Sequence, residues 1–245
     1  MTLGTAPLPQ SLPNNARNKL LARMSSSDLA ALQPHLQPVE LKFRQRLESP
    51  SRKIRSAFFI ERGLASVVAI GGGDRRQSEV TVVGNEGMTG LPLLLGVDRS
   101  PTETFMQVEG AGQSIAAEDL HAAMRASATL TAFMMRYAHV CAIQMAHTAL
   151  ANAQGKLEER LARWLLMAHD RSRADELELT HEFLALMLGV RRPGVTMALH
   201  QLEQKALVRT ARGSVTVLDR VGLEGCANGL YGTPEAEYDR LIPAA

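Results

Sequence analysis

Apolar residues recur at steps of three and four over 179–203, in two short runs separated by a glycine. The first run begins at Thr180, a good helix N-cap, and Gly189 can adopt the positive φ that ends a helix. Pro193 is tolerated in the first turn of the second run, because the first N–H groups of a helix have no partner within it. The pattern predicts two short helices joined by a tight turn. The buried face of the second helix is expected to consist of Val195, Ala198, Leu199 and Leu202.

The opposite face of the second helix carries polar residues, which suits a helix that lies in the major groove of DNA. A short β-hairpin with a basic, glycine-containing tip is expected over 206–218, where a wing would follow the recognition helix. Between 191 and 220 there are six Lys and Arg residues against two acidic ones, an excess of +4. Such an excess is typical of a surface that contacts phosphates. We therefore predict a winged helix-turn-helix, with an ordinary helical hairpin in a core as the alternative.

Short alternating or apolar runs, separated by turn residues, occupy 38–118. They predict an antiparallel β-sandwich or barrel. The expected strands are at 39–43, 57–60, 66–70, 79–83, 105–109 and 114–116. A glycine-rich stretch at 71–74 predicts a hairpin turn, while 1–15 is expected to be loose and 16–33 helical.

Residues 119–153 contain few helix breakers and are predicted to form one long helix. Apolar residues recur on more than one side of it, so more than one side must be buried. One face is expected to pack on the sheet and another on a second copy of the chain, with burial inside one chain as the alternative. The expected dimer face consists of Leu130, Met134, Tyr137, Cys141 and Met145. A hinge is expected at 152–156, followed by a helix at 157–169 that opens a second domain.

The composition is that of an ordinary globular protein: 245 residues, 45% hydrophobic, 21% charged, with a net charge of +2. Nucleic-acid binding must therefore come from local patches rather than from the whole chain. Two cysteines, Cys141 and Cys226, cannot form a disulfide framework, and they favour a reducing, cytoplasmic setting. The longest apolar run, 91–97, is too short to span a membrane and the N-terminus lacks a signal-peptide core, so no membrane association is expected.

The order of a small β-barrel, a long helix, a hinge and a winged helix-turn-helix resembles the Crp/Fnr superfamily of bacterial transcription regulators over 16–220. The matching segments are LTHEFLALMLGVRRPGVTMALHQLEQKALV in the C-terminal part, and FFIERGLASVV and TVVGNEGMTGLPLLLG in the barrel. The fold class is expected to be α+β: an N-terminal antiparallel β-barrel or jelly roll with a long dimerisation helix, then a C-terminal winged helix-turn-helix domain. The expected boundaries are 1–118 for a cyclic-nucleotide-binding-like sensor domain, 119–153 for the dimerisation helix and 154–245 for the DNA-binding domain.

The resemblance implies a homodimer that places one recognition helix in each half-site of a palindrome in double-stranded DNA. By position in the family motif, Arg192 corresponds to the arginine that reads a guanine edge, a contact that contributes roughly 1–3 kcal/mol of discrimination. Pro193 and Met197 stand where well-known relatives have Glu and Arg, so the operator is expected to differ in part from theirs. The other expected DNA-contacting residues are Thr196 and His200, and for phosphates Arg191, Arg209 and Arg212. RNA polymerase is a further candidate partner.

Cyclic-nucleotide-binding relatives hold the cyclic phosphate with a Gly-Glu element followed by an Arg-Ser or Arg-Thr pair. The residues of this chain that partly match are Gly84, Glu86 and Gly87 for the first element and Arg99 and Ser100 for the second. The pair comes early, and the nearby carboxylate of Glu103 would repel a phosphate. These five residues form a candidate effector pocket. The regulator is nevertheless expected to be independent of cyclic AMP, with an unknown effector; a cyclic-nucleotide-responsive regulator is the alternative.

No nucleophile elbow, His-Glu-x-x-His, Walker loop or Rossmann fingerprint occurs, so an enzyme is not expected. No cofactor or metal is expected either. No cysteine precedes Cys141, which excludes an N-terminal iron–sulfur cluster on ligand count, and 38–118 contains no Cys or His to hold haem. A last alternative is a ligand-sensing protein-interaction module whose DNA-binding domain no longer functions.

Overall fold

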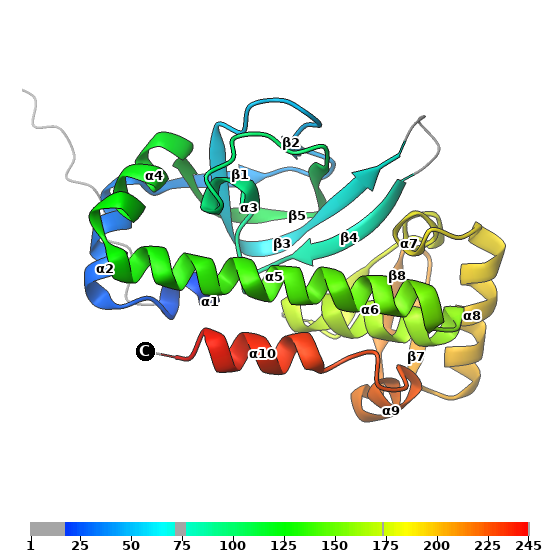
Figure 1. The fold of residues 1–245 in the computed structure, drawn as a ribbon. Coiled ribbons are helices and arrows are strands. Elements are labelled where there is room, and N and C mark those ends of the chain that lie inside the picture. Colours follow the sequence, from blue (N-terminus) through cyan, green and yellow to red (C-terminus); the bar gives the residue numbers. More distant parts are fainter. Residues whose placement is uncertain (1–17, 72–76, 173, 245) are drawn as a thin grey trace, which may run out of the picture.

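The N-terminal part is a curved antiparallel sheet flanked by helices (Figure 1). The computed structural model describes residues 18–71, 77–172 and 174–244, so residues 1–15 and most of the expected turn at 71–74 lie outside the described residues. The elements of this part are α1 (Lys19–Ala22), α2 (Ser26–Leu32), a 3₁₀ turn η1 (Gln33–His35), β1 (Gln37–Leu41), β2 (Arg46–Glu48), β3 (Ser56–Ile70), β4 (Gln77–Val83), α3 (Leu91–Leu94) and β5 (Glu103–Ala116).

The strands form one sheet with the order β1-β5-β3-β4, and β2 pairs with β5. β3 and β5 each replace two of the expected short strands with one long strand. Register shifts between Ile60 and Ala65 mark bulges, which kink the long strands and let the sheet curve. Gly110 lies at this bend, where an added Cβ would come 1.9 Å from the carbonyl oxygen of Arg62. Glycines that were expected to lie between short strands therefore lie at bends inside the long strands.

The expected helix at 119–153 is two helices, α4 (Ala117–Ala126) and α5 (Ala128–Gln154), so the prediction of one helix was wrong. Ser127 separates them with an extended backbone, at φ −128° and ψ 112°. Its Oγ accepts a hydrogen bond from the backbone N–H of Leu130 at 3.1 Å and donates to Asp28 of α2 at 2.7 Å. A serine that satisfies backbone groups in this way ends one helix and starts the next.

The C-terminal part starts directly after α5. Its elements are α6 (Leu157–Arg171), β6 (Glu176–Glu178), α7 (His181–Leu188), α8 (Arg192–Gln204), β7 (Val208–Ala211), β8 (Ser214–Val217), α9 (Arg220–Cys226) and α10 (Thr233–Leu241). β6, β8 and β7 form a small antiparallel sheet in that order. α6 and the two strands of the expected wing confirm the sequence prediction, whereas β6, α9 and α10 were not expected.

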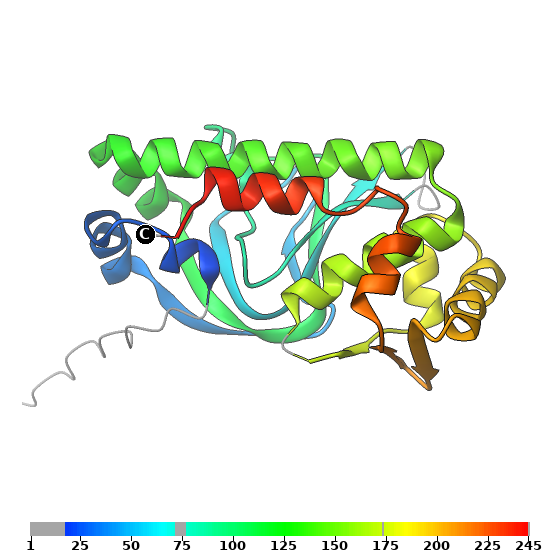
Figure 2. The ribbon, with the colours of Figure 1, turned by 90° about the horizontal axis from the view of Figure 1, so that it is seen from below.

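The last helix returns to the N-terminal part of the chain. Figure 2 shows α10 running beside α5, and the two helices are in contact. Asp239 of α10 forms a 2.8 Å ion pair with Arg23, while Ile242 is completely buried among residues of α4 and α5. The expected domain at 154–245 includes this helix, although it packs on the expected sensor domain and long helix.

Strands β3 and β4 pack against α6 and α7 of the C-terminal part, and one hydrophobic core joins them. Leu64, Val68 and Val82 of the sheet share this core with Trp164 of α6 and Leu184 of α7. The position of the C-terminal part is therefore fixed by apolar burial as well as by chain connection. Within the described ranges, the structure has no helix that combines the length and the apolar character needed to cross a membrane.

Candidate nucleic-acid interface

The predicted helix-turn-helix is present and is stabilised locally in the expected way. The Thr180 side chain accepts a hydrogen bond from the backbone N–H of Phe183 at 3.2 Å, which caps α7. Gly189 ends α7 in the left-handed region at φ +64°. α8 then begins beyond Arg191, with Pro193 in its first turn.

The second helix buries the expected apolar face, since Val195, Ala198, Leu199 and Leu202 are each at most 2% exposed. All seven side chains expected to contact DNA lie on the exposed surface of α8 or of the β7–β8 hairpin: Arg191, Arg192, Thr196, Met197, His200, Arg209 and Arg212. Thr196 is already engaged, because its Oγ1 lies 3.0 Å from Nδ1 of His181 and donates to the carbonyl of Arg192 at 3.2 Å. Contact of these residues with DNA stays a prediction.

Four of the six cations in 191–220 form no ion pair with any residue that the structure describes. Lys205 forms a 2.5 Å ion pair with Glu158, and Arg220 forms a 2.7 Å ion pair with Asp170. Among the described residues, no carboxylate lies within 4.0 Å of the four others, which are Arg191, Arg192, Arg209 and Arg212. The basic footprint is therefore these four arginines, at the start of α8 and on the hairpin.

The hairpin is held against the second helix by one carboxylate. Glu203 of α8 accepts hydrogen bonds from the backbone N–H of Thr210 at 2.6 Å and from its Oγ1 at 2.8 Å. These hydrogen bonds, the backbone one foremost, hold the pKa of Glu203 below its ordinary value. Arg212 lies beside Gly213 in the two-residue turn of the hairpin, and Gly213 has a φ of +83°. The tip of the wing is thus set in position relative to α8.

The expected dimer face of α5 was wrong for four of its five residues. Leu130, Met134, Tyr137 and Cys141 are at most 8% exposed and belong to the core of one chain, while Met145 is half-buried. The Tyr137 hydroxyl accepts from the backbone N–H of Met88 at 2.9 Å and donates to its carbonyl at 3.0 Å. The sheet and neighbouring helices of the same chain cover this face, so a second copy cannot reach it.

A different line of α5 is exposed, and sequence reasoning missed it. Its members recur in alternating steps of four and three residues, the spacing of helices that pack along each other. This line, the α5 seam, consists of Ala128, Ala132, Met135, His139, Ala142, Ala146, Ala149 and Ala153. Six of its eight residues are alanines, so stronger apolar residues on neighbouring lines masked the repeat.

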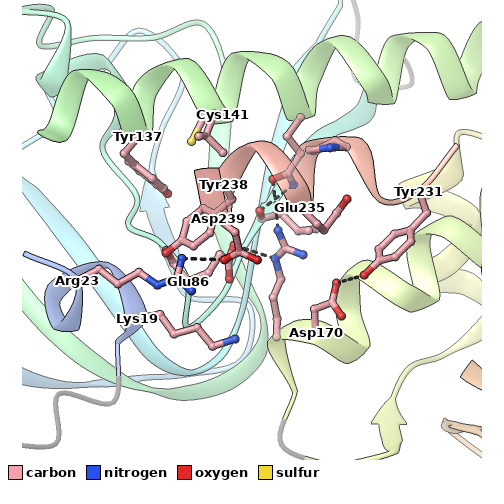
Figure 3. Close-up of a pocket in the computed structure, with 15 residues that line it drawn as sticks. Lys19, Arg23, Glu86, Tyr137, Cys141, Asp170, Tyr231, Glu235, Tyr238 and Asp239 are labelled. Atoms are coloured by element: carbon pink, nitrogen blue, oxygen red, sulfur yellow. Dashed lines mark hydrogen bonds and ion pairs between the residues drawn. The ribbon is translucent and has the colours of Figure 1, made fainter. Parts of the chain in front are cut away.

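The five residues of the expected effector pocket do not form one pocket. Glu86 accepts from Nε of Arg171 in α6 at 2.8 Å, and in Figure 3 it lies among Arg23, Tyr238 and Asp239. The Cβ position of Gly87 would lie 2.2 Å from the Tyr137 hydroxyl. Gly84 donates its backbone N–H to Glu86. This half of the expected pocket is therefore filled by α5 and α6.

The other half of the expected pocket faces solvent. The Arg99 side chain is 62% exposed and lies 3.6 Å from Asp98, while the Ser100 hydroxyl bonds Thr102 Oγ1 at 2.6 Å. Glu103, which was expected to repel a phosphate, forms an ion pair with Arg46. Because Glu86 is paired with Arg171 and Arg99 faces solvent, these residues do not form an anion-binding site.

The junction of the sheet and α6 contains a buried carboxylate, that of Glu79. Glu79 accepts hydrogen bonds from Oγ of Ser66 and from Nε1 of Trp164, both at 2.6 Å. Burial raises the pKa of Glu79 to about 7 despite these hydrogen bonds. No sequence pattern pointed to it, because its partners come from two distant segments.

The two cysteines lie in environments that favour the unreactive thiol form. Burial raises the pKa of Cys141 to about 12 and that of Cys226 to about 11, so both are thiols at neutral pH. Across the described ranges, no three His, Cys, Asp or Glu side chains are grouped so that they could hold a metal ion. His139 lies exposed on the α5 seam, whereas Cys141 is buried.

A recognition helix with a wing, attached through a long helix to a curved sheet, is the architecture of a helix-turn-helix transcription regulator. Residues 159–226 match the Crp-like helix-turn-helix domain family. No curated protein matches the chain.

Three solved structures of similar fold extend the comparison to most of the chain. A Crp/Fnr-family transcriptional regulator from Eubacterium rectale is 18% identical, with 87% of this chain and 99% of that chain covered and a TM-score of 0.66. FixK2 from Bradyrhizobium japonicum is 13% identical, with 78% and 96% covered and a TM-score of 0.68. A Crp-family transcriptional regulator from Thermus thermophilus is 22% identical, with 78% and 97% covered and a TM-score of 0.59. Residues 159–226 thus match a Crp-like helix-turn-helix domain, and the fold of the chain is similar to that of Crp/Fnr-family structures, as the sequence predicted.

Proposed function

We propose that this protein is a cytoplasmic, homodimeric transcription regulator that binds a specific palindromic DNA site and is not an enzyme. The observation that carries the proposal is the set of four exposed arginines, at the start of α8 and on the wing, that form no ion pair within the described part of the chain. Unpaired arginines on a recognition helix can bond phosphates and base edges without first breaking an ion pair. RNA polymerase is the partner through which such a regulator would act.

Base reading is expected to centre on Arg192. It stands in the first turn of α8, where side chains reach base edges in helix-turn-helix proteins. Met197, which is 66% exposed, offers only apolar contact, as with a thymine methyl group. Pro193 cannot accept or donate a hydrogen bond through its side chain. The operator is thus expected to carry a guanine that Arg192 contacts and an apolar group, such as a thymine methyl, that Met197 contacts.

The α5 seam supports the homodimer. A second helix can cover an exposed line of small residues with heptad spacing at little cost in free energy. Alanines also allow the two helices to approach closely. Pairing of two identical seams gives the two-fold symmetry that a palindrome requires. The seam replaces the dimer face expected from the sequence.

A response to cyclic AMP is the second candidate, and the geometry disfavours it. The acid of the expected pocket, Glu86, is neutralised by Arg171, and the arginine of that pocket, Arg99, faces solvent. A regulator independent of cyclic AMP is therefore the better reading. A protein-interaction module with a non-functional DNA domain is disfavoured by the unpaired arginines.

Salt dependence of DNA binding tests the proposal. Arg191, Arg209 and Arg212 are the expected phosphate contacts, so six arginines in a dimer predict a slope of log K against log salt of about −5. Replacing Arg209 and Arg212 by Ala should make that slope shallower by about 3 to 4. Arg125→Ala is the matched control, because Arg125 is exposed on α4 and far along the chain from the wing. A slope near zero, or an equal effect of the control, would contradict DNA binding through this surface.

A further inference from the structure

A cavity of about 290 Å³ lies where the two parts of the chain meet (Figure 3). Its walls come from α1, α5, α6 and the C-terminal segment that ends in α10. Small-molecule sites are concave, partly apolar and often placed at junctions between domains. Of the five residues expected to bind a cyclic nucleotide, Glu86 lines this cavity, whereas Gly84, Gly87, Arg99 and Ser100 do not.

Part of the lining is apolar and rigid. Val140 and the ring of Tyr137 contribute from α5, and Tyr238 contributes from α10. The Tyr137 hydroxyl is fixed by the backbone of Met88, and that of Tyr238 donates to the carbonyl of Glu86 at 2.7 Å. Rings held in this way present a preformed apolar surface to a ligand.

Most charges at the cavity are already paired. Arg171 and Glu86 form a 2.8 Å ion pair, and Arg23 and Asp239 form another at 2.8 Å. The Asp170 carboxylate pairs with an arginine outside the cavity at 2.7 Å. These groups have no charge left for a ligand.

Two lining charges have no such partner. Within the part of the chain that the structure describes, no oppositely charged side chain lies within 4.0 Å of Lys19 on α1 or of Glu235 on α10. Glu235 uses Oε2 to accept the backbone N–H of Gly232 at 3.0 Å, and its Oε1 makes no hydrogen bond to a described residue. Figure 3 shows the two side chains apart, on walls formed by different helices. One cation and one carboxylate at separate places complement a ligand that carries both charges at its two ends.

We propose that the cavity binds a short zwitterionic peptide of apolar residues, with the size of a dipeptide. Its carboxylate would bond Lys19, its ammonium would bond Glu235, and its side chains would lie on Tyr137, Val140 and Tyr238. Because the walls belong to the sensor part, to α6 and to the C-terminal helix, such a ligand would act as the effector; that regulatory role rests on the proposed function.

Binding of three forms of one probe separates the two charges. Calorimetry would compare L-leucyl-L-leucine with its N-acetyl form, which lacks the cation, and its C-terminal amide, which lacks the anion. Loss of one charge-assisted hydrogen bond is expected to weaken binding about tenfold or more. Lys19→Met should abolish the preference over the amide, and Glu235→Gln should abolish the preference over the N-acetyl form.

Controls keep the test independent of folding and of DNA. Glu235→Gln retains an oxygen that can cap α10, and Glu237→Gln changes the same helix at a residue that does not line the cavity. No binding of the free dipeptide, equal binding of all three forms, or unchanged preferences in both variants would overturn the proposal. Since the readout is peptide binding, DNA binding by the protein without peptide would leave the proposed function intact.

Discussion

Arg171 of α6, which is buried, and Glu86 of the N-terminal part, which is half-buried, form an ion pair at 2.8 Å, with side-chain exposures of 6% and 17%. The guanidinium is also held by the carbonyl of Met167 at 2.7 Å and by Oε1 of Gln144 at 3.2 Å. One arginine therefore connects the first helix of the DNA-binding part, the long helix α5 and the loop after β4. The contact between the two parts of the chain therefore includes specific polar interactions as well as apolar packing.

Removal of one partner of this pair should cost more than removal of both. Arg171→Met leaves the half-buried carboxylate of Glu86 without its cation, and we expect a loss of about 3 kcal/mol in the free energy of unfolding, the lower end of the range for buried pairs. The double variant with Glu86→Gln should recover part of that loss. Urea denaturation of the four proteins in the cycle measures the coupling; purely additive losses would contradict a coupled pair.

Glu79 predicts a pH dependence of stability. Its pKa is raised by burial from 4.5 to about 7, so its protonated form is favoured by folding. This contribution to the free energy of unfolding is full below about pH 4.5 and is lost as the pH rises through about 7, with an upper limit of about 3 kcal/mol. Glu79→Gln mimics the protonated form, so the variant should gain stability relative to the native protein between pH 5 and pH 8. An identical difference at both pH values in urea denaturation would contradict this role.

A charge on the α5 seam should prevent formation of the proposed dimer. Ala142→Glu would place two carboxylates against each other at the centre of the paired seams, where like charges repel. Analytical ultracentrifugation should show a monomer at concentrations at which the native protein is a dimer. Ala122→Glu, the same change at an exposed residue of α4, should leave the dimer intact. A dimeric Ala142→Glu protein would show that another surface makes the contact.

Both cysteines should react slowly. With pKa values of about 12 and about 11, Cys141 and Cys226 hold little thiolate at pH 8, so modification by a disulfide reagent should be about 100-fold slower than in the unfolded chain. DNA binding should be unchanged by mild peroxide. Rapid modification of either thiol in the native protein would contradict the environments described.

The helix-turn-helix could be predicted because its signals are local. The Thr180 cap, the Gly189 stop and Pro193 in the first turn each act within one turn of the chain. The antiparallel strands followed from alternation, although the bends at Gly63 and Gly110 hid the continuity of β3 and β5.

The buried side of α5 and the effector pocket could not be predicted in the same way. α5 has apolar residues around much of its circumference, so spacing alone did not show which line faces inward. The line of α5 that faces inward depends on α10, which returns from the end of the chain to pack beside α5. The pairing of Glu86 with Arg171 joins residues 85 positions apart, and no local pattern reports such a contact.

Selection of bound duplexes from a random pool tests the central claim most directly. It would use the native protein and Arg192→Ala, with and without cyclic AMP. The account predicts that the native protein enriches a palindrome without nucleotide, and that Arg192→Ala loses the preference for one guanine in each half-site. Enrichment that requires cyclic AMP would contradict independence from the nucleotide, and no enrichment of any sequence would contradict sequence-specific DNA binding.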